Sequence, residues 1–148
     1  MNARHDDAIN ILERDHEELK ALFRAYDNLG DRTADNKKMI TDAICQVLIQ
    51  HVQMEEKTFY PAVTEIIKDK NLMDEVEIEI ATVRDLIWQI QCMNPDDDLY
   101  DPVVKVLEEE ITLHVSEVED EMFPKLRRSK IDLLALGEEM RARRELLH

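Results

Sequence analysis

The chain has little of the material that builds turns and sheets: its 148 residues include two glycines and four prolines, and 5% are aromatic. Tight turns draw on glycine and proline, and strands are enriched in aromatic side chains. Leucine, glutamate, lysine, methionine and alanine are frequent instead, and these residue types favour helices. The composition therefore argues against a sheet-based fold and predicts an all-α protein. A length of 148 residues fits one domain over residues 1–148.

Cysteine is scarce as well, and the sequence has no long apolar run. Cys45 and Cys92 show no CxxC or other metal-type spacing, and apolar residues flank both, so we expect buried free thiols. No segment approaches the ~20 consecutive apolar residues that span a bilayer. The first fifteen residues also lack the apolar core of a signal peptide. These features predict a cytoplasmic protein that does not enter a membrane.

Basic residues are outnumbered, with 19 lysines and arginines against 34 aspartates and glutamates and a formal net charge of −15. This charge repels nucleic acid and anionic membrane surfaces, so neither is an expected partner. A cation is a more suitable partner for a protein with this negative charge. Most of the acidic residues nevertheless alternate with lysine and arginine, as on solvated helix faces.

Apolar residues recur at steps of three and four and predict four long helices followed by a shorter one. The expected boundaries are Asp6 or Asp7, Gly30, Thr33 to Asp35, a break or kink at Pro61, a start near Asn71, Asp101 as N-cap with Pro102 as the first residue, and a break at residues 129–132. We expect an antiparallel up-down four-helix bundle with an additional short C-terminal helix packed across it. Arg141, Arg143 and Arg144 suit the negative end of that last helix's dipole.

One segment occurs twice: HVQMEEKTFYP at residues 51–61 returns as HVSEVEDEMFP at residues 114–124. His51 and Glu55 are four residues apart and share one helix face, where they form either metal ligands or a buried ion pair. His16 precedes His51 by 35 positions and Ile80 precedes His114 by 34, so the chain reads as two related helical hairpins. In this repeat, Ile80 corresponds to His16, and Val118 corresponds to Glu55.

The chain resembles the hemerythrin-like proteins, also called HHE cation-binding domains. The resemblance rests on His16 in RDHEEL, the two repeated segments, the NPDDDLYDP loop, and the FPKLRRS and LLALGEEM tail. It implies a four-helix bundle that typically holds a non-haem di-iron centre, with histidines from all four helices and two bridging carboxylates. It also implies that the protein binds or senses oxygen, nitric oxide or iron.

The resemblance carries over only in part. Four residues match ligand positions of the family, namely His16, His51, Glu55 and His114. Ile80 and Val118 stand where relatives have a histidine and a glutamate. Glu119, five residues after His114, has the spacing of a carboxylate in oxygen-carrying hemerythrins and is a candidate for the missing bridge. Too few donors then remain for two irons, so we expect one iron ion or none.

The remaining side chains receive simpler interpretations. Glu77 and Glu110 could lean inward, but we expect both to be solvated. Trp88 adjoins the inward position Ile87, and we expect it to pack. His5 and His148 lie near the ends of the chain and are expected at the surface.

Three functions fit this sequence. We favour a non-enzymatic metal-binding protein with a reduced non-haem iron site, whose partners are the metal ion and a small diatomic ligand. The second is a non-haem iron oxidoreductase acting on oxygen or peroxide. The third is a metal-free degenerate bundle, natural or engineered, that serves interaction or structure. In that case Glu55 would accept hydrogen bonds from protonated His51 and His16. The oligomeric state stays open.

Overall fold

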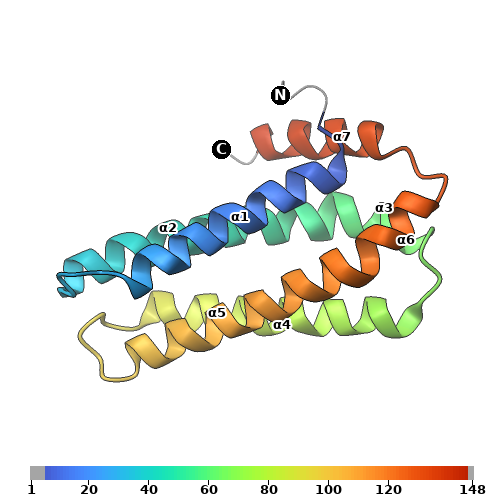
Figure 1. Cartoon of the computed structure of the whole chain (residues 1–148). Coiled ribbons are helices and arrows are strands. Elements are labelled where there is room, and N and C mark those ends of the chain that lie inside the picture. The colour runs from blue at the N-terminus through green and yellow to red at the C-terminus, as the bar shows by residue number, and fades with distance from the viewer. Residues whose placement is uncertain (1–5, 147–148) are drawn as a thin grey trace.

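The computed structural model describes residues 6–146, and none of these residues forms a strand. Its four long helices are α1 (Ala8–Asp27), α2 (Ala34–Met54), α4 (Lys70–Cys92) and α5 (Tyr100–Glu117). The short elements are η2 (Glu55–Phe59) and α3 (Tyr60–Thr64) after α2, η3 (Val118–Met122) and α6 (Phe123–Arg128) after α5, and the final α7 (Leu133–Leu146). Figure 1 shows two antiparallel hairpins, α1 with α2 and α4 with α5, and α7 lying across the first of them. The predicted all-α bundle with an extra C-terminal helix is confirmed.

Polar side chains begin the helices where the sequence predicts. The Asp7 carboxylate accepts from the Asn10 backbone N–H at 2.9 Å, and the Asn10 side chain accepts from the Asp7 N–H at 3.2 Å. Thr33 accepts from the Asn36 N–H at 3.2 Å at the start of α2. Such caps satisfy N–H groups that have no partner within the helix.

The core runs the length of the bundle between the two hairpins. Its largest fully buried members include Leu12, Leu19, Ile44, Leu48, Phe59, Leu107, Met122 and Leu126. Polar side chains interrupt this apolar core, and the buried ones include three histidines and a glutamate. No helix within the described range is both long and apolar enough to cross a membrane.

Each repeated segment contains a wide π-helical turn. η2 and η3 both begin four residues after the segment's histidine and end two residues before its proline. Proline has no N–H, and its ring collides with the carbonyl four residues earlier in an α-helix, so a wider turn accommodates it. The sequence predicted a break or kink at Pro61, and the structure has a wide turn after which the helix continues as α3.

The predicted start of the fourth long helix was wrong by two residues. α5 begins at Tyr100, with Leu99 rather than Asp101 at the N-cap position. The Asp101 carboxylate instead accepts from the Tyr26 hydroxyl and pairs with Arg32 at 3.1 Å and Lys37 at 3.2 Å. The Asp101 carboxylate therefore contacts the other hairpin and does not cap its own helix.

Two side chains of α4 also differ from expectation. Cys45 is buried as predicted, but Cys92 is exposed, and Trp88 is 69% exposed instead of packed. Each residue of an α-helix turns about 100° from the last. Trp88 follows the buried Ile87 and Cys92 lies two residues after the buried Ile90, so both point away from the core.

α7 lies very close to the start of α1. A Cβ atom added at Gly137 would come within 3.0 Å of the Asp6 carbonyl oxygen, the Asp7 carbonyl carbon and the Ala8 nitrogen. All three are backbone atoms, which cannot move aside as a side chain can. The glycine therefore allows α7 and the beginning of α1 to meet backbone against backbone.

We predict that Gly137→Ala lowers the free energy of unfolding by about 1–3 kcal/mol, because the added methyl group pushes the two backbones apart. Chemical unfolding followed by circular dichroism measures this. Gly30→Ala is the matched control, since nothing lies within 4 Å of its added Cβ and neither glycine has a positive φ. We expect Gly30→Ala to change stability by less than about 0.5 kcal/mol. Equal effects of the two substitutions would show that the close approach does not matter.

Candidate metal centre

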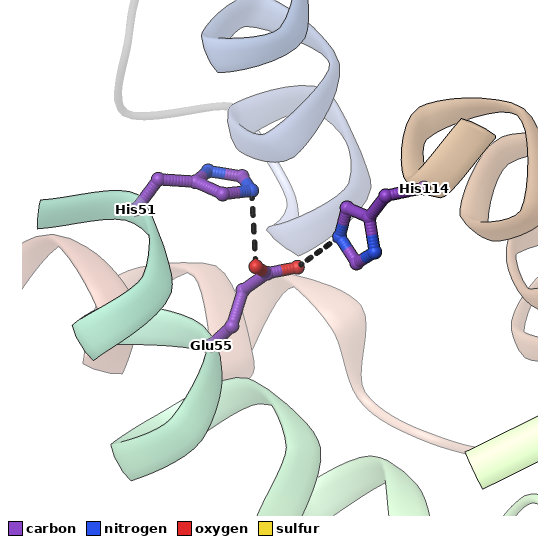
Figure 2. A group of neighbouring side chains, drawn as sticks. All are labelled: His51, Glu55 and His114. Carbon is purple, nitrogen blue, oxygen red and sulfur yellow. Dashed lines mark ion pairs between the residues drawn. The ribbon is translucent and has the colours of Figure 1, made fainter. Parts of the chain in front are cut away.

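Four polar side chains meet in the middle of the bundle core. His16 comes from α1, His51 from α2, Glu55 from the first residue of η2, and His114 from α5. Their exposed fractions are 0%, 2%, 0% and 4%. Ligand atoms of His51, Glu55 and His114 all lie within 4.8 Å of one another, and Figure 2 shows both imidazoles directed at the carboxylate.

Glu55 is the centre of this group. Its Oε1 lies 3.2 Å from Nε2 of His51, and its Oε2 lies 3.5 Å from Nε2 of His114. The Tyr60 hydroxyl donates to Oε2 at 2.8 Å. Burial and the charge of Glu55 raise the pKa of Tyr60 well above its usual range, so this hydroxyl keeps its proton and stays a donor.

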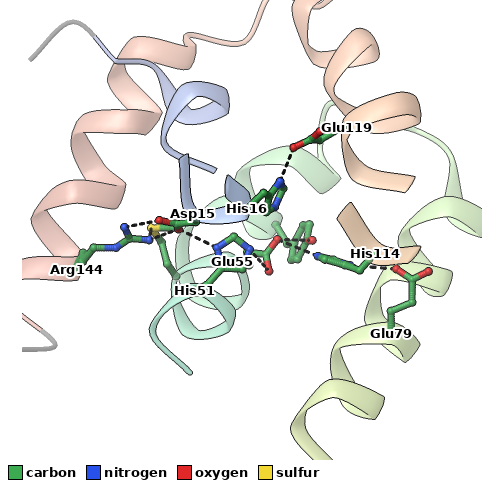
Figure 3. Close-up of polar contacts among 10 residues, drawn as sticks. Asp15, His16, His51, Glu55, Glu79, His114, Glu119 and Arg144 are labelled. Atoms are coloured by element: carbon green, nitrogen blue, oxygen red, sulfur yellow. Dashed lines mark hydrogen bonds and ion pairs between the residues drawn. The ribbon is translucent and has the colours of Figure 1, made fainter. Parts of the chain in front are cut away.

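A carboxylate outside the group holds each imidazole by its Nδ1 (Figure 3). The pairs are His16 with Glu119 at 2.7 Å, His51 with Asp15 at 2.9 Å, and His114 with Glu79 at 3.1 Å. A carboxylate only accepts, so Nδ1 carries the hydrogen and, in the neutral ring, Nε2 keeps its lone pair. Histidines that bind metals are held in the same way.

The inward-facing atoms have no aligned hydrogen-bond partner within residues 6–146. They are Nε2 of His16, His51 and His114, and Oε1 of Glu55. The 3.2 Å approach of His51 to Glu55 attracts opposite charges but lacks hydrogen-bond geometry. Buried polar atoms are rarely left without a partner. His51, Glu55 and His114, whose ligand atoms lie within 4.8 Å of one another, offer two imidazoles and a carboxylate, and such a donor set suits a divalent transition-metal ion. His16 lies outside this group of three but lines the same cavity, so the residues fit a metal.

A small cavity lies among these residues. His16, His51, Glu55 and His114 line it together with apolar side chains that include Ile80, and it has about 10 Å³ of room for the centre of a water-sized sphere. That is about enough for one water molecule. Ile80 borders the cavity without offering a donor, and Val118, which corresponds to Glu55 in the repeat, is fully buried.

The other candidate carboxylates lie elsewhere. Glu119 contacts the outer nitrogen of His16 and is 28% exposed, so the structure places it behind a histidine and outside the inner group. Glu77 is exposed and Glu110 is half-buried, and neither belongs to the group. His5 and His148 lie outside the described residues.

The internal repeat contained a signal for the supporting carboxylates, which sequence analysis missed. Asp15 and Glu79 are 64 positions apart, as are His16 and Ile80, which directly follow them. Each of these two acids holds the histidine of the next long helix in its own hairpin. The carboxylate therefore recurs in the second hairpin, although the inward donor His16 has an apolar counterpart there, Ile80.

The same comparison explains Glu119. Its counterpart, 63 positions earlier, is Glu56. Glu119 holds His16, whereas Glu56 forms an ion pair with Arg84 beside an open pocket that Ile80 also lines. Glu56 has no imidazole to hold because Ile80 stands at the position of His16. Tyr60, the donor to Glu55, was also missed, and no pattern in the sequence marked it.

Without a metal ion, protons on two imidazoles balance the negative charge of Glu55. Burial would raise the pKa of Glu55, but His51 and His114 hold it well below its usual range. Burial opposes the charged form of both imidazoles, yet Glu55, with Asp15 or Glu79, raises the pKa of His51 to about 9 and of His114 to about 10. Burial and the charge of His51 lower the pKa of His16. Without a metal, two charged imidazoles therefore flank one carboxylate at neutral pH.

The chain is similar to a known protein family and to a solved structure. The family model described as "Hemerythrin HHE cation binding domain" matches residues 7–126. No curated protein matches the chain. The crystal structure of a Hemerythrin HHE cation binding domain-containing protein from Mycobacterium kansasii superposes with a TM-score of 0.79 and 22% identity, covering 95% of this chain and 86% of that one. At this identity the likeness shows a shared fold.

We predict that the metal-free protein loses stability as the pH rises from about 6.5 to about 10. His51 and His114 have folded pKa values of about 9 and 10, above the ordinary value of 6.5. Their stabilisation is complete below pH 6.5 and disappears as the pH passes through the folded values. Urea unfolding in the presence of a chelator at several pH values measures this slope.

Glu55→Gln tests the cause of that slope. The substitution removes the negative charge that keeps both imidazoles protonated. The free energy of unfolding should therefore change less between pH 6.5 and 10. Stability at pH 7 should fall by about 3 kcal/mol, as when a buried ion pair loses one member. Glu56→Gln is the control, because the Glu56 side chain is 37% exposed and its pair with Arg84 is superficial. An unchanged slope in Glu55→Gln would contradict the assignment.

Proposed function

The chain belongs to the hemerythrin HHE cation-binding family, and on that premise we propose that it holds one iron ion through His16, His51, Glu55 and His114. One observation carries the proposal. Four donor atoms on these residues are buried, face inward and have no aligned hydrogen-bond partner in the described part of the chain. An ion between His51, Glu55 and His114 would satisfy three of them and replace the protons on His51 and His114, and His16 on the wall of the same cavity would supply the fourth ligand.

The number of donors supports one ion in place of the family's usual pair. Ile80 and Val118 have no lone pairs, and both are buried, at 5% and 0% exposure. A second divalent ion would lose its water without gaining enough anionic ligands, which is strongly unfavourable. The cavity, with about 10 Å³ of room, is also of the right order for a single ion and no more.

The surrounding residues would prepare the site for this ion. Asp15, Glu79 and Glu119 fix the imidazole rings and favour the tautomer with a free Nε2, and Tyr60 fixes the Glu55 carboxylate. Iron with open coordination positions binds or activates small molecules such as oxygen or nitric oxide. Four protein donors leave such positions open, so we propose a diatomic ligand as the second partner.

An adjacent pocket gives such a ligand a route. The pocket measures about 810 Å³, opens to solvent, and is lined by Tyr60 and Ile80 among others. Because Ile80 also lines the inner cavity, its side chain forms part of the wall between the pocket and the proposed ion. We propose that a small ligand enters past Ile80.

The same pocket favours a second function. A space of about 810 Å³ beside a metal site can hold an organic molecule, which suits an oxidoreductase that uses oxygen or peroxide. The metal-free alternative is supported by the ion pairs of Glu55 with the charged imidazoles of His51 and His114, which need no metal ion. Metal content and affinity separate the metal-free alternative from the other two functions.

We predict that anaerobic titration with Fe(II) gives about one ion per chain, and that affinity increases from pH 6 to about pH 10. His51 and His114 must lose protons before their Nε2 atoms can bind, so binding releases protons. His51→Ala should reduce affinity at least 100-fold, whereas Glu110→Gln, outside the group, should leave it unchanged. A stoichiometry of two would refute the single-ion site, and no binding would favour the metal-free alternative.

We further predict that Ile80→His combined with Val118→Glu raises binding toward two irons per chain, with the near-ultraviolet absorption of an oxo-bridged pair. The two changes restore donors at both replaced positions. Glu56, the counterpart of Glu119, would be placed to hold the new imidazole by its Nδ1. Adding Glu56→Gln should therefore weaken the second ion about 10-fold. Ile80→Leu with Val118→Ile is the matched control and should keep one ion.

A further inference from the structure

One side chain of the C-terminal helix, Arg144, binds a carboxylate that holds a histidine of the candidate metal centre. Nη1 and Nη2 of Arg144, in α7, donate to the two oxygens of Asp15 at 3.0 and 2.5 Å. The same carboxylate accepts from Nδ1 of His51 at 2.9 Å. Figure 3 shows the resulting line from Arg144 through Asp15 to His51 and Glu55. Nη2 of Arg144 also donates to the sulfur of Met54, the residue before Glu55, at 3.3 Å.

This contact differs from an ordinary surface ion pair. The Asp15 side chain is 8% exposed and that of Arg144 is 26% exposed. Two parallel hydrogen bonds between a guanidinium and a carboxylate fix the orientation of both groups. Burial would raise the pKa of Asp15, but His51 and Arg144 hold it below its usual value, so Asp15 stays an acceptor.

The arrangement is unequal among the three histidines. Within residues 6–146, Arg144 is the one arginine or lysine that pairs with a carboxylate holding an imidazole. In the same range, Glu119 forms an ion pair with His16 but with no lysine or arginine, and Glu79 lies beside another acid, Glu117. His51, four residues before Glu55, is therefore supported by a carboxylate that is itself held by an arginine, and His16 and His114 are not.

α7 has separate anchors that do not touch the site. Nη1 of Arg141 donates to the Asp6 carbonyl oxygen at 2.8 Å, and Gly137 allows close approach to the start of α1. α7 also lies beyond the family match, which ends at residue 126. The contact of Arg144 with Asp15 therefore joins a helix outside the matched range to a residue within it.

We propose that Arg144 is a positioning residue of the metal centre and that docking of α7 is coupled to metal binding at His51. With Arg144 in place, Asp15 is held in one orientation and selects the imidazole tautomer that offers Nε2 to an ion. Without it, Asp15 can turn and the neutral ring can exchange tautomers, so fewer molecules are ready to bind. Coupling is reciprocal, so an ion that needs the oriented ring also favours the docked helix. This inference rests on the proposed function.

The test compares Arg144→Gln with Arg141→Gln in the full chain. Both changes remove one guanidinium from α7, but only the first removes a contact with Asp15. Competition with a chromophoric chelator should give Fe(II) and Co(II) affinities about 10- to 100-fold weaker for Arg144→Gln. Arg141→Gln should stay within about twofold of the unmodified protein. The absorption bands of bound Co(II) should change in Arg144→Gln alone.

Hydrogen exchange of α7 supplies a readout that loss of stability alone would not move. In the unmodified protein, adding metal should slow exchange of the α7 amides. Arg141→Gln should raise exchange with and without metal yet keep this slowing, whereas Arg144→Gln should abolish it. Arg144→Lys retains the charge without the two-pronged geometry, and we expect an intermediate affinity.

Each outcome is decisive. An unmodified protein that binds no metal overturns the proposed function and this inference together. If it binds metal and the glutamine variants at positions 141 and 144 behave alike, only this inference fails, and α7 is a structural cover. If Arg144→Gln does not fold by circular dichroism, the affinity of Arg144→Lys relative to Arg141→Gln decides in its place, and equal affinities overturn the inference.

Discussion

The structure depends most on one constraint: a fully buried carboxylate cannot remain in an apolar core without partners. Burying an unpaired charge is very costly, so each group near Glu55 supplies positive charge or a hydrogen. His51 and His114 approach its two oxygens and Tyr60 donates to one of them. Those imidazoles need acceptors of their own, which Asp15 and Glu79 provide. The polar contacts thus spread outward in layers from a single side chain, and they connect both hairpins.

The overall fold could be predicted because helix periodicity and capping are local properties of the sequence. His16, His51, Glu55 and His114 were found because they lie on inward stripes, and the structure brings them into one region. Asp15 and Glu79 could not be found in the same way. An acid beside an inward residue looks like any solvated acid until a neighbouring helix places an imidazole against it. Periodicity also assumes a constant turn, so it could not place Glu119, which lies within the π-helical segment η3.

The two hairpins show that backbone geometry and donor chemistry are separable in this fold. Both contain a π-helical turn at the same distance from the histidine and the proline, and both place a carboxylate behind that histidine. One hairpin carries His16 and Glu55 where the other carries Ile80 and Val118. Apolar side chains fill those positions without altering the backbone pattern, as close packing of the core requires. The same backbone pattern therefore carries donors in one hairpin and apolar side chains in the other.

The wide turn after His51 determines which later side chain faces Glu55. η2 places Glu55 at its first residue and Tyr60 directly after its last. If the same residues formed an ordinary α-helix, every residue after the turn would be rotated by about 100° relative to Glu55. The Tyr60 hydroxyl would then leave Glu55, and Pro61 would again meet a carbonyl beneath its ring. The wide turn is therefore what brings Tyr60 to Glu55, and the exposed Lys57 within it takes no part in that contact.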